Sequence, residues 1–307
     1  MTSPYKNLPN NILKTVAYFD VFDYPLTTEQ IFRFLPQNSI SHGDVENAVE
    51  HMVKSKELVK EKSYFLLPST HRNITEKREA EERRAKKRLK YARNISRFIK
   101  SLPFIRAVFI TGSLSKNVAA SSSDIDFMIV AAPERLWVCR TMLTAFRKIF
   151  LFGSSKYFCT NFYVTENGYA QQRRNIFTAI EVATTKVIWN ESAFLEFQRQ
   201  NQWMKEFLPN INVSTDQKLM ISSSRSLSQQ IIEIILSILP LRALNIRLME
   251  FHRTYWQRSF NHTSTEQFNM MFIISPDISA GWPDDRQETI LKEFHHRLSS
   301  LGIRESL

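Results

Sequence analysis

Two acidic residues stand one residue apart in the segment Asp124-Ile125-Asp126, which opens an apolar run. In a β-strand, side chains two residues apart point to the same side, so we expect Asp124 and Asp126 to be neighbours and Ile125 and Phe127 to face the core. Adjacent carboxylates repel each other unless a cation or a proton intervenes. Mg²⁺ prefers oxygen ligands, and two such ions can bind the attacking and leaving oxygens of a phosphoryl transfer. The spacing predicts a site for two Mg²⁺ or Mn²⁺ ions, against the alternative of two strand-end acids that cap a loop.

A Gly-Ser pair precedes these acids and fits the same chemistry. Gly112 and Ser113 are separated from Asp124 by ten residues, and most of that gap is the small, polar stretch "SKNVAASSS". A glycine at the exit of a strand lets backbone amides approach phosphate oxygens, and the Ser113 hydroxyl adds a donor. We interpret the glycine as making room for a triphosphate whose metals the two acids hold.

The combination of Gly112-Ser113, the gap and Asp124-Ile125-Asp126 resembles the signature of the DNA polymerase β-like nucleotidyltransferase superfamily. The motif covers about residues 108–130. A looser similarity to bacterial nucleotidyltransferase-domain proteins takes in the N-terminal region, the segment "ERLWVCR" and the C-terminal tail. The resemblance implies a mixed sheet with flanking helices and the transfer of a nucleoside monophosphate from an NTP, with release of pyrophosphate. By position, Gly112 and Ser113 would hold the NTP phosphates, and Asp124 and Asp126 would hold the catalytic metals.

This superfamily usually supplies a third carboxylate from a neighbouring strand, as a metal ligand and as the base for the acceptor hydroxyl. The corresponding segment here is "FCTNFYV", and its central polar residue is Asn161. An asparagine can offer a carbonyl oxygen to a metal, but it cannot accept a proton as a base. Glu166 at the end of that strand, or Glu181 on the following helix, could substitute. The identity of the base therefore stays open, and so does an inactive site.

Two cations and one tryptophan are further candidates for contacts with a nucleotide. Lys116 and Arg140 could bind phosphates, although a surface charge or an ion pair is an equal alternative. Trp137 could stack on a base, although such a ring more often belongs to a core. The sequence identifies neither the NTP nor the acceptor, which could be RNA, a protein side chain or a small molecule.

The N-terminal region reads as three helices and a hairpin over residues 10–67, an order that resembles a winged helix-turn-helix. In such a unit the third helix enters the major groove of DNA. That helix here carries Asp44, Glu46 and Glu50, which phosphates would repel. We therefore expect residues 1–70 to form a winged-helix-like domain that does not read DNA sequence and serves for packing or protein contacts.

A basic segment follows over residues 72–100, with twelve Lys or Arg against four Glu. It contains no Gly or Pro, so a long helix is predicted, and Pro103 ends it. Leu89, Ala92, Ile95 or Ser96, and Ile99 give its C-terminal half a buried stripe. Its cations surround the helix, so some could face a nucleic acid while others are solvated.

The remaining chain divides into an α/β core over residues 103–170 and a mainly helical region over residues 171–307, with residues 71–102 as the basic connecting helix. Together these elements predict an α+β protein with a mixed sheet. The pattern from residue 175 to about residue 260 reads as helical. The segment "FNMMFIIS" reads as a short strand or an extended segment, and "IIEIILSILPL" as a buried helix that is too short and too interrupted to span a bilayer.

Composition limits the class of protein. The 307 residues carry a formal net charge of +11, which favours an anionic partner or a solvated basic face. Two cysteines, Cys139 and Cys159, argue against a disulfide framework, and the N-terminal residues lack the apolar core of a signal peptide. We expect a cytoplasmic chain with reduced thiols and no membrane segment.

Two hypotheses remain from the sequence. The first is an active, magnesium-dependent nucleotidyltransferase. The second is a catalytically impaired protein of the same fold that binds nucleic acid or a protein partner, in part through its basic helix. A third acid within reach of Asp124 and Asp126 would favour the first hypothesis.

Overall fold

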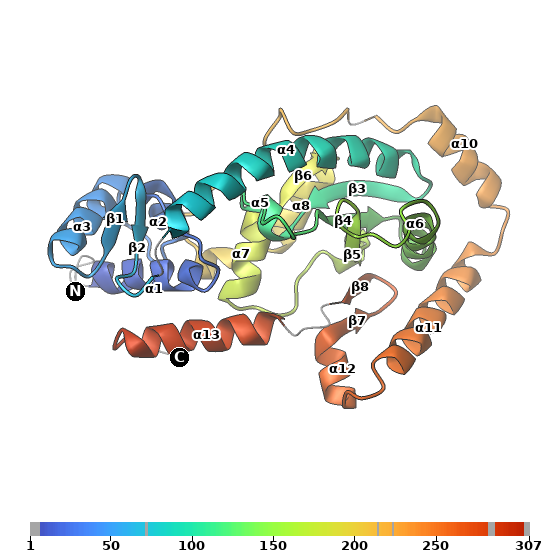
Figure 1. Ribbon diagram of the computed structural model, residues 1–307. Coiled ribbons are helices and arrows are strands. Elements are labelled where there is room, and N and C mark those ends of the chain that lie inside the picture. The colour runs from blue at the N-terminus through green and yellow to red at the C-terminus, as the bar shows by residue number, and fades with distance from the viewer. Residues whose placement is uncertain (1–6, 71–72, 214, 223, 282–285, 304–307) are drawn as a thin grey trace.

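The computed structural model describes residues 7–70, 73–213, 215–222, 224–281 and 286–303 (Figure 1). Its helices and strands are α1 (Leu8–Asp20), α2 (Thr28–Phe34), α3 (His42–Lys54), β1 (Val59–Glu61), β2 (Tyr64–Leu66), α4 (Ile74–Ser101), β3 (Ile105–Ile110), α5 (Gly112–Ser115), β4 (Asp126–Ala131), α6 (Leu136–Phe150), β5 (Cys159–Val164), the 3-10 turn η2 (Glu166–Gly168), α7 (Ile176–Thr184), β6 (Lys186–Trp189), α8 (Glu191–Gln200), α9 (Met204–Phe207), α10 (Leu227–Leu236), α11 (Leu241–Ser259), α12 (Thr265–Met271), β7 (Phe272–Ile274), β8 (Ile278–Gly281) and α13 (Arg286–Ser300).

A mixed six-stranded sheet in the order β6-β3-β4-β5-β8-β7 forms the centre of this α+β protein. Only β4 and β5 run parallel, and the other neighbouring strands are antiparallel. The expectation of a mixed sheet is confirmed. The described residues of 171–307 are mainly helical, and the region also contributes β6, β7 and β8 to the sheet, of which β6 was expected to be helical. The segment of β6 contains Val187, Ile188 and Trp189, which favour strands, and four residues are too few for a period to distinguish a strand from a helix.

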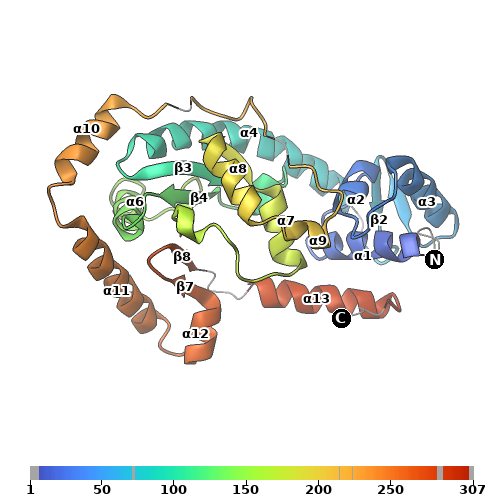
Figure 2. The same ribbon diagram turned by 180° about the vertical axis from the view of Figure 1, so that it is seen from behind.

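The two faces of the sheet bury separate hydrophobic clusters, because alternate residues of each strand point to opposite sides. Phe127 and Ile129 of β4 face α4 and α6, whereas Met128 and Val130 face α7 and α8. Figure 2 shows α7 and α8 lying in front of the sheet, with α4 running along its edge behind them. Asp126 starts β4 and belongs to the face that α7 and α8 cover.

The N-terminal region forms the predicted three helices and hairpin. Thr27 and Ser41 cap α2 and α3, and the side chain of each accepts a hydrogen bond from the backbone N–H three residues on. In return, the backbone N–H of each cap residue donates to the side chain of Gln30 or Asp44. This region has no separate core, since Ile12 and Val49 belong to the same buried cluster as Phe109 of the sheet. It is therefore one end of a continuous hydrophobic core, where α13 returns to pack against α1 (Figure 1).

The long basic helix is confirmed as α4, which crosses from the N-terminal region to the sheet. Ala92, Ser96 and Ile99 are buried against the sheet, as the stripe predicts. Two arginines of this helix, Arg78 and Arg88, are also buried, which the charge count alone does not reveal.

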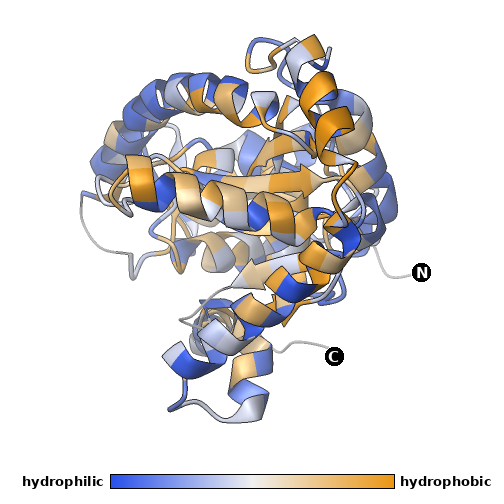
Figure 3. Ribbon diagram, turned by 90° about the vertical axis from the view of Figure 1, so that its right-hand side faces the viewer, coloured by the Kyte–Doolittle hydropathy of each residue, from blue (hydrophilic) through white to orange (hydrophobic). Residues whose placement is uncertain are grey.

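The expectation that "IIEIILSILPL" is a buried helix is wrong. In α10 the polar residues Gln229 and Glu233 face the protein, where Gln229 donates to the Leu102 carbonyl at 2.8 Å and Glu233 pairs with Arg106 at 2.9 Å. The apolar residues face outward, and Ile234 and Ile238 are 69% and 85% exposed. In Figure 3 the ribbon of α10 is coloured mostly as hydrophobic. A pattern of apolar residues predicts a helix, but not which face the neighbours cover. Within the described residues, no helix combines the length and the apolar character that crossing a membrane needs.

Candidate functional site

The Gly-Ser turn and the first acid of β4 meet at one end of the sheet. Ile110 of β3 is the register partner of Phe127, and the Thr111 N–H donates to the Asp126 carbonyl at 3.1 Å. Gly112 has a φ of +65°, and a Cβ at this position would lie 2.5 Å from Asp126 Oδ2. Glycine is therefore required twice, by the left-handed backbone and by the approach of a carboxylate. The side chain that lies against Gly112 is that of Asp126, which is a reason for the glycine that the sequence alone does not reveal.

Asp124 lies just before β4 rather than within it. The Ser155 hydroxyl donates to Asp124 Oδ2 at 2.7 Å, which ties the acid to the loop between α6 and β5. Ile125 and Phe127 are both buried on the α4 side, so the predicted inward direction of these two residues is confirmed. Asp124 and Asp126 are both half-buried, and the negative charge of Asp124 acts on Asp126.

Two arginines of α4 hold the loop that joins Gly112 to Asp124. The Arg88 guanidinium donates to the Ser121 carbonyl at 2.9 Å and to the Ser123 hydroxyl at 2.6 Å. Arg84, one turn earlier, donates to the Ala119 carbonyl. Sequence reasoning left these cations to phosphates or solvent and missed this positioning role. The available signal is their spacing of four residues, which places both on one face of the helix.

Cys159 and Asn161 extend the site along β5. Asp126 and Cys159 are register partners, and the Cys159 thiol hydrogen-bonds the Asp126 carboxylate. The Asn161 amide in turn donates to Cys159 Sγ at 2.9 Å. Asn161 therefore lies at the same end of the sheet as Asp126 and is linked to it through the buried Cys159, whose place at this site no motif in the sequence indicates.

The electrostatics around Asp126 are unfavourable for an isolated carboxylate. Burial is the largest cause that raises its pKa, and the negative charges of Asp124 and Glu181 raise it further. The Cys159 hydrogen bond and the positive charge of Arg286 lower it, but the net direction is upward. A cation beside Asp126 would remove both the repulsion and much of the cost of burying the charge.

Lys116 and Glu181 form an ion pair beside this acid pair. Lys116 Nζ lies 2.6 Å from Glu181 Oε1, and it also donates to the Gly112 carbonyl at 3.2 Å. Their side chains are 13% and 28% exposed, so the pair is shielded on most sides. Of the two expected roles for Lys116, the ion pair is the one that the structure contains. Ser113 is half-buried in the first turn of α5.

Glu166 lies at the wrong end of the sheet. Because β4 and β5 are parallel, Asp126 pairs with Cys159, whereas Val130 pairs with Val164 just before Glu166. Cys159 and Val164 are five strand steps apart, which is roughly 17 Å at about 3.3 Å per residue, and Glu166 comes two residues after Val164. The suggestion that Glu166 could replace the missing carboxylate is therefore wrong, and Glu181 is the acid near Asp126.

Arg140 is buried in an aromatic enclosure rather than presented to a nucleotide. Its guanidinium lies 4.7 Å from the Trp256 ring, 5.0 Å from the Tyr163 ring and 6.0 Å from the Trp137 ring. Its single hydrogen bond among these contacts goes to the Asn161 carbonyl at 3.4 Å. Burial lowers the pKa of Arg140 to about 10. The phosphate role predicted for Arg140 is corrected to a packing role, and Trp137 belongs to the core.

Across the described ranges, no group of three or more His, Cys, Asp or Glu side chains is arranged to hold a metal ion. The oxygen-bearing side chains at this end of the sheet are those of Asp124 and Asp126, with Asn161 linked to Asp126 through Cys159. When this chain is compared with protein-family models, with curated proteins and with solved structures, none of them matches it.

Proposed function

We propose that this protein is a magnesium- or manganese-dependent nucleotidyltransferase of the DNA polymerase β-like type. The observation that carries the proposal is the contact between Gly112 and the Asp126 carboxylate, which joins the Gly-Ser turn and the acid pair at one end of a mixed sheet. This arrangement accounts for a glycine, a serine and two acids that are otherwise costly to place together. The acceptor is RNA, a protein or a small molecule.

The acid pair suits a divalent cation. Asp124 and Asp126 would hold the metal, and Asn161 could add a neutral carbonyl oxygen. The raised pKa of Asp126, with Asp124 and Glu181 as negative neighbours, supports a cation at this place. When bound, Mg²⁺ would neutralise the phosphates of the NTP and orient them for in-line transfer.

The chain's own residues supply binding and positioning. The Gly112 turn would present backbone amides and the Ser113 hydroxyl to the phosphates. Arg84 and Arg88 fix the loop that carries Asp124, so the acid does not have to be ordered when the substrate binds. Glu181, which pairs with Lys116 and whose negative charge acts on Asp126, is the candidate for the base that accepts a proton from the acceptor hydroxyl.

A second candidate is the impaired protein of the same fold. It is favoured by the absence, among the described residues, of a third carboxylate arranged as a metal ligand, and by Asn161 in the place of that acid. Such a protein could bind an anionic partner through α4, where Arg83, Lys86 and Lys87 remain exposed.

The experiment that separates the two is a transfer assay with labelled NTPs. Each NTP is incubated with Mg²⁺ or Mn²⁺ and with RNA, protein or small-molecule acceptors, and both pyrophosphate release and labelled product are measured. We expect metal-dependent transfer that the double substitution Asp124→Asn with Asp126→Asn abolishes. Binding of NTP, RNA or protein without turnover would support the second candidate, and the absence of turnover and of all such binding would refute both.

A further inference from the structure

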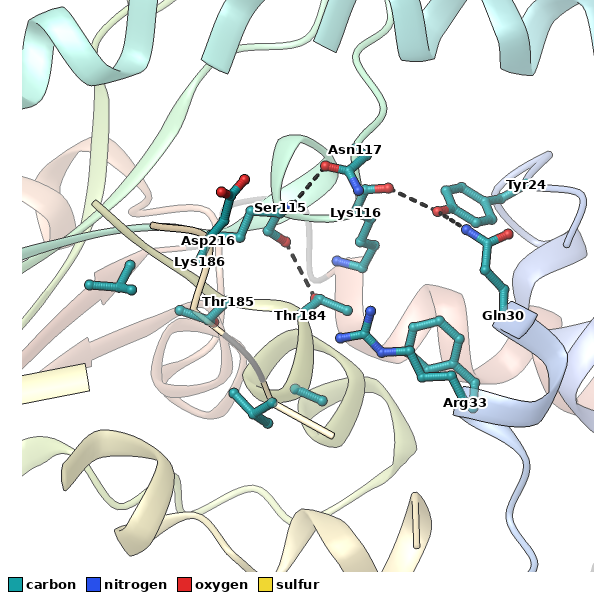
Figure 4. Close-up of a pocket in the computed structure, with 14 residues that line it drawn as sticks. Tyr24, Gln30, Arg33, Ser115, Lys116, Asn117, Thr184, Thr185, Lys186 and Asp216 are labelled. Carbon is teal, nitrogen blue, oxygen red and sulfur yellow. Dashed lines mark hydrogen bonds between the residues drawn. The ribbon is translucent and has the colours of Figure 1, made fainter. Parts of the chain in front are cut away.

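A second polar site lies beyond Lys116, in a pocket of about 130 Å³ between the N-terminal region and the sheet. Its walls come from α2, the end of α5, the end of α7 and the start of β6 (Figure 4). A single water needs roughly 10–15 Å³ by the same measure, so the pocket has room for a polyatomic ion together with several waters. Nothing in the nucleotidyltransferase proposal uses this space.

Three cations from three separate parts of the chain line the pocket. Arg33 comes from α2, Lys116 follows α5 and Lys186 begins β6, whereas Asp216 is the one acid among the described lining residues. Figure 4 shows Arg33 and Lys116 directed into the same space from opposite sides. Because Glu181 already pairs with Lys116, the excess of positive charge in the lining comes from Arg33 and Lys186 against Asp216.

These cations have donor capacity that the protein leaves unused. Arg33 Nε is buried without a hydrogen-bond partner in the described part of the chain. Lys186 Nζ donates to Asn117 Oδ1 at 2.7 Å, and an ammonium group has three donors. Leaving a buried charged donor unpaired costs free energy, so an acceptor that binds here gains from the pairing.

The neutral groups of the lining are already paired. The Tyr24 hydroxyl donates to the Lys116 carbonyl at 2.8 Å, and the Ser115 hydroxyl donates to the Gly112 carbonyl at 2.8 Å. Thr185 Oγ1 donates to the Glu181 carbonyl at 2.8 Å. What remains for a ligand is mainly N–H donors on cations, which suits an acceptor-rich anion and not a neutral molecule.

The titration behaviour of the cations agrees with this geometry. Burial is the main cause that lowers the pKa of Lys186, Asp216 raises it, and the positive charge of Arg33 lowers it further. Burial also lowers the pKa of Arg33. A bound anion would oppose both effects.

We propose that this pocket binds a phosphate group, held between Arg33, Lys116 and Lys186. Cations that approach from three directions match a tetrahedral anion with oxygens on every side, and an arginine fork pairs well with phosphate. The phosphate is either free inorganic phosphate or part of a larger phosphate-bearing ligand. Lys116 also belongs to the ion pair beside Asp126, so the two sites are adjacent and their independence needs a direct test.

The test measures thermal unfolding and calorimetric binding with inorganic phosphate, with tripolyphosphate and with ATP, all without divalent metal and at constant ionic strength set by chloride. We expect inorganic phosphate to raise the melting temperature. Stabilisation by tripolyphosphate and ATP but not by inorganic phosphate would identify the ligand as an oligophosphate. Stabilisation by none of the three would overturn the proposal.

Substitutions locate the effect. Arg33→Gln and Lys186→Gln should each weaken phosphate binding by about tenfold or more, since each removes a charge-assisted hydrogen bond. Arg83→Gln removes the same charge from an exposed position on α4 and should leave binding unchanged. Arg33→Lys, which keeps the charge, should retain part of the affinity and guards against a variant that fails to fold.

The acid pair provides the remaining control. Asp124→Asn with Asp126→Asn should leave metal-free phosphate binding intact, because neither acid lines the pocket. Equal binding in Arg33→Gln and the wild type, or loss of binding in the acid variant, would show that the phosphate occupies another site.

Discussion

The acid pair at Asp126 and the phosphate pocket beyond Lys116 are two polar sites of opposite charge that share one ion pair. At the first, the half-buried Asp126 hydrogen-bonds the Cys159 thiol and experiences the negative charges of Asp124 and Glu181. At the second, three cations surround a space that contains a single lining acid among the described residues. The Lys116–Glu181 pair joins the sites, with the lysine in the pocket wall and the glutamate near Asp126.

The difference lies in how the chain builds each site. The acid pair comes from one short stretch, in which a turn and a strand start are brought together by pairing of neighbouring strands. The pocket comes from residues 33, 116, 186 and 216, which meet only when the N-terminal region docks on the sheet. A site of the first kind leaves a motif in the sequence, and a site of the second kind does not.

The largest expected effect comes from removing the acid pair. Asp124→Asn with Asp126→Asn should lower nucleotidyl transfer by at least about 10³-fold, because several kcal/mol of charge stabilisation depend on the metal. The same substitution should abolish stabilisation by Mg²⁺ with an NTP, which is about 2.7 kcal/mol at one hundred times the dissociation constant. Thermal unfolding with and without these ligands measures the second effect independently of any acceptor. An unchanged response in the double variant would refute the metal site.

The next effect concerns the base. Glu181→Gln should lower turnover by about 10²–10⁴-fold, the usual contribution of general-base catalysis. Turnover is measured under conditions that saturate the NTP, so that binding does not obscure the chemical step. If the base instead belongs at the position of Asn161, where the superfamily usually has a carboxylate, Asn161→Asp should raise turnover and Glu181→Gln should have little effect.

Glu166→Gln is the matched control for this prediction. It removes the same charge from an exposed position at the opposite end of β5. Turnover should stay at the wild-type level. Equal losses in Glu166→Gln and Glu181→Gln would indicate a general effect of charge rather than a base.

Features that depend on one short stretch of sequence could be predicted, whereas features that depend on distant segments could not. The helices of residues 8–54, the hairpin and α4 were predictable because capping residues and helical spacing are local signals. The closeness of Gly112 and Asp126 was predictable as well, although its reason was not, since the contact of a Cβ with Oδ2 requires coordinates. Composition could not show that Arg140 lies among aromatic rings.

The errors in the C-terminal half have a common physical cause. β6 is four residues long and carries too short a pattern to be distinguished from a helix. In α10 the apolar residues predict a buried face, yet Glu233 anchors the helix through Arg106 and the Phe104 N–H, so the polar face is the covered one. Both outcomes depend on neighbours distant in sequence.

A smaller effect tests the contact that joins the turn to the acid. Gly112→Ala should destabilise the fold by about 2–5 kcal/mol, the sum of about 1–2 kcal/mol for a left-handed alanine and about 1–3 kcal/mol for displacing the Asp126 carboxylate. Gly153→Ala is the control, because Gly153 has a φ of +79° and no atom within 4 Å of a built Cβ. It should cost about 1–2 kcal/mol from the backbone alone. Denaturant unfolding of both variants gives the difference between their losses of unfolding free energy. Equal losses would mean that the Asp126 side chain moves aside without an energetic cost.

The smallest effect is the dependence of stability on pH that Asp126 imposes in metal-free buffer. Its pKa is raised in the folded protein, chiefly by burial, so the folded state holds this proton more tightly than the unfolded state. The ionised carboxylate therefore lowers the free energy of unfolding. This destabilisation is absent below the unfolded pKa of about 3.9 and fully present above the folded pKa. Asp126→Asn should be more stable than the wild type at neutral pH, and the difference should shrink as the pH falls through this window.

Glu196 should show a pH dependence of the opposite sign. Hydrogen bonds from Arg199 and Gln200 lower its pKa to about 2, so Glu196→Gln should lose a small, solvent-screened stabilisation at neutral pH that fades on acidification. Denaturant unfolding across this range measures both slopes, and a wild-type advantage over Asp126→Asn at neutral pH without metal would contradict the description of Asp126 as an acid that needs a cation.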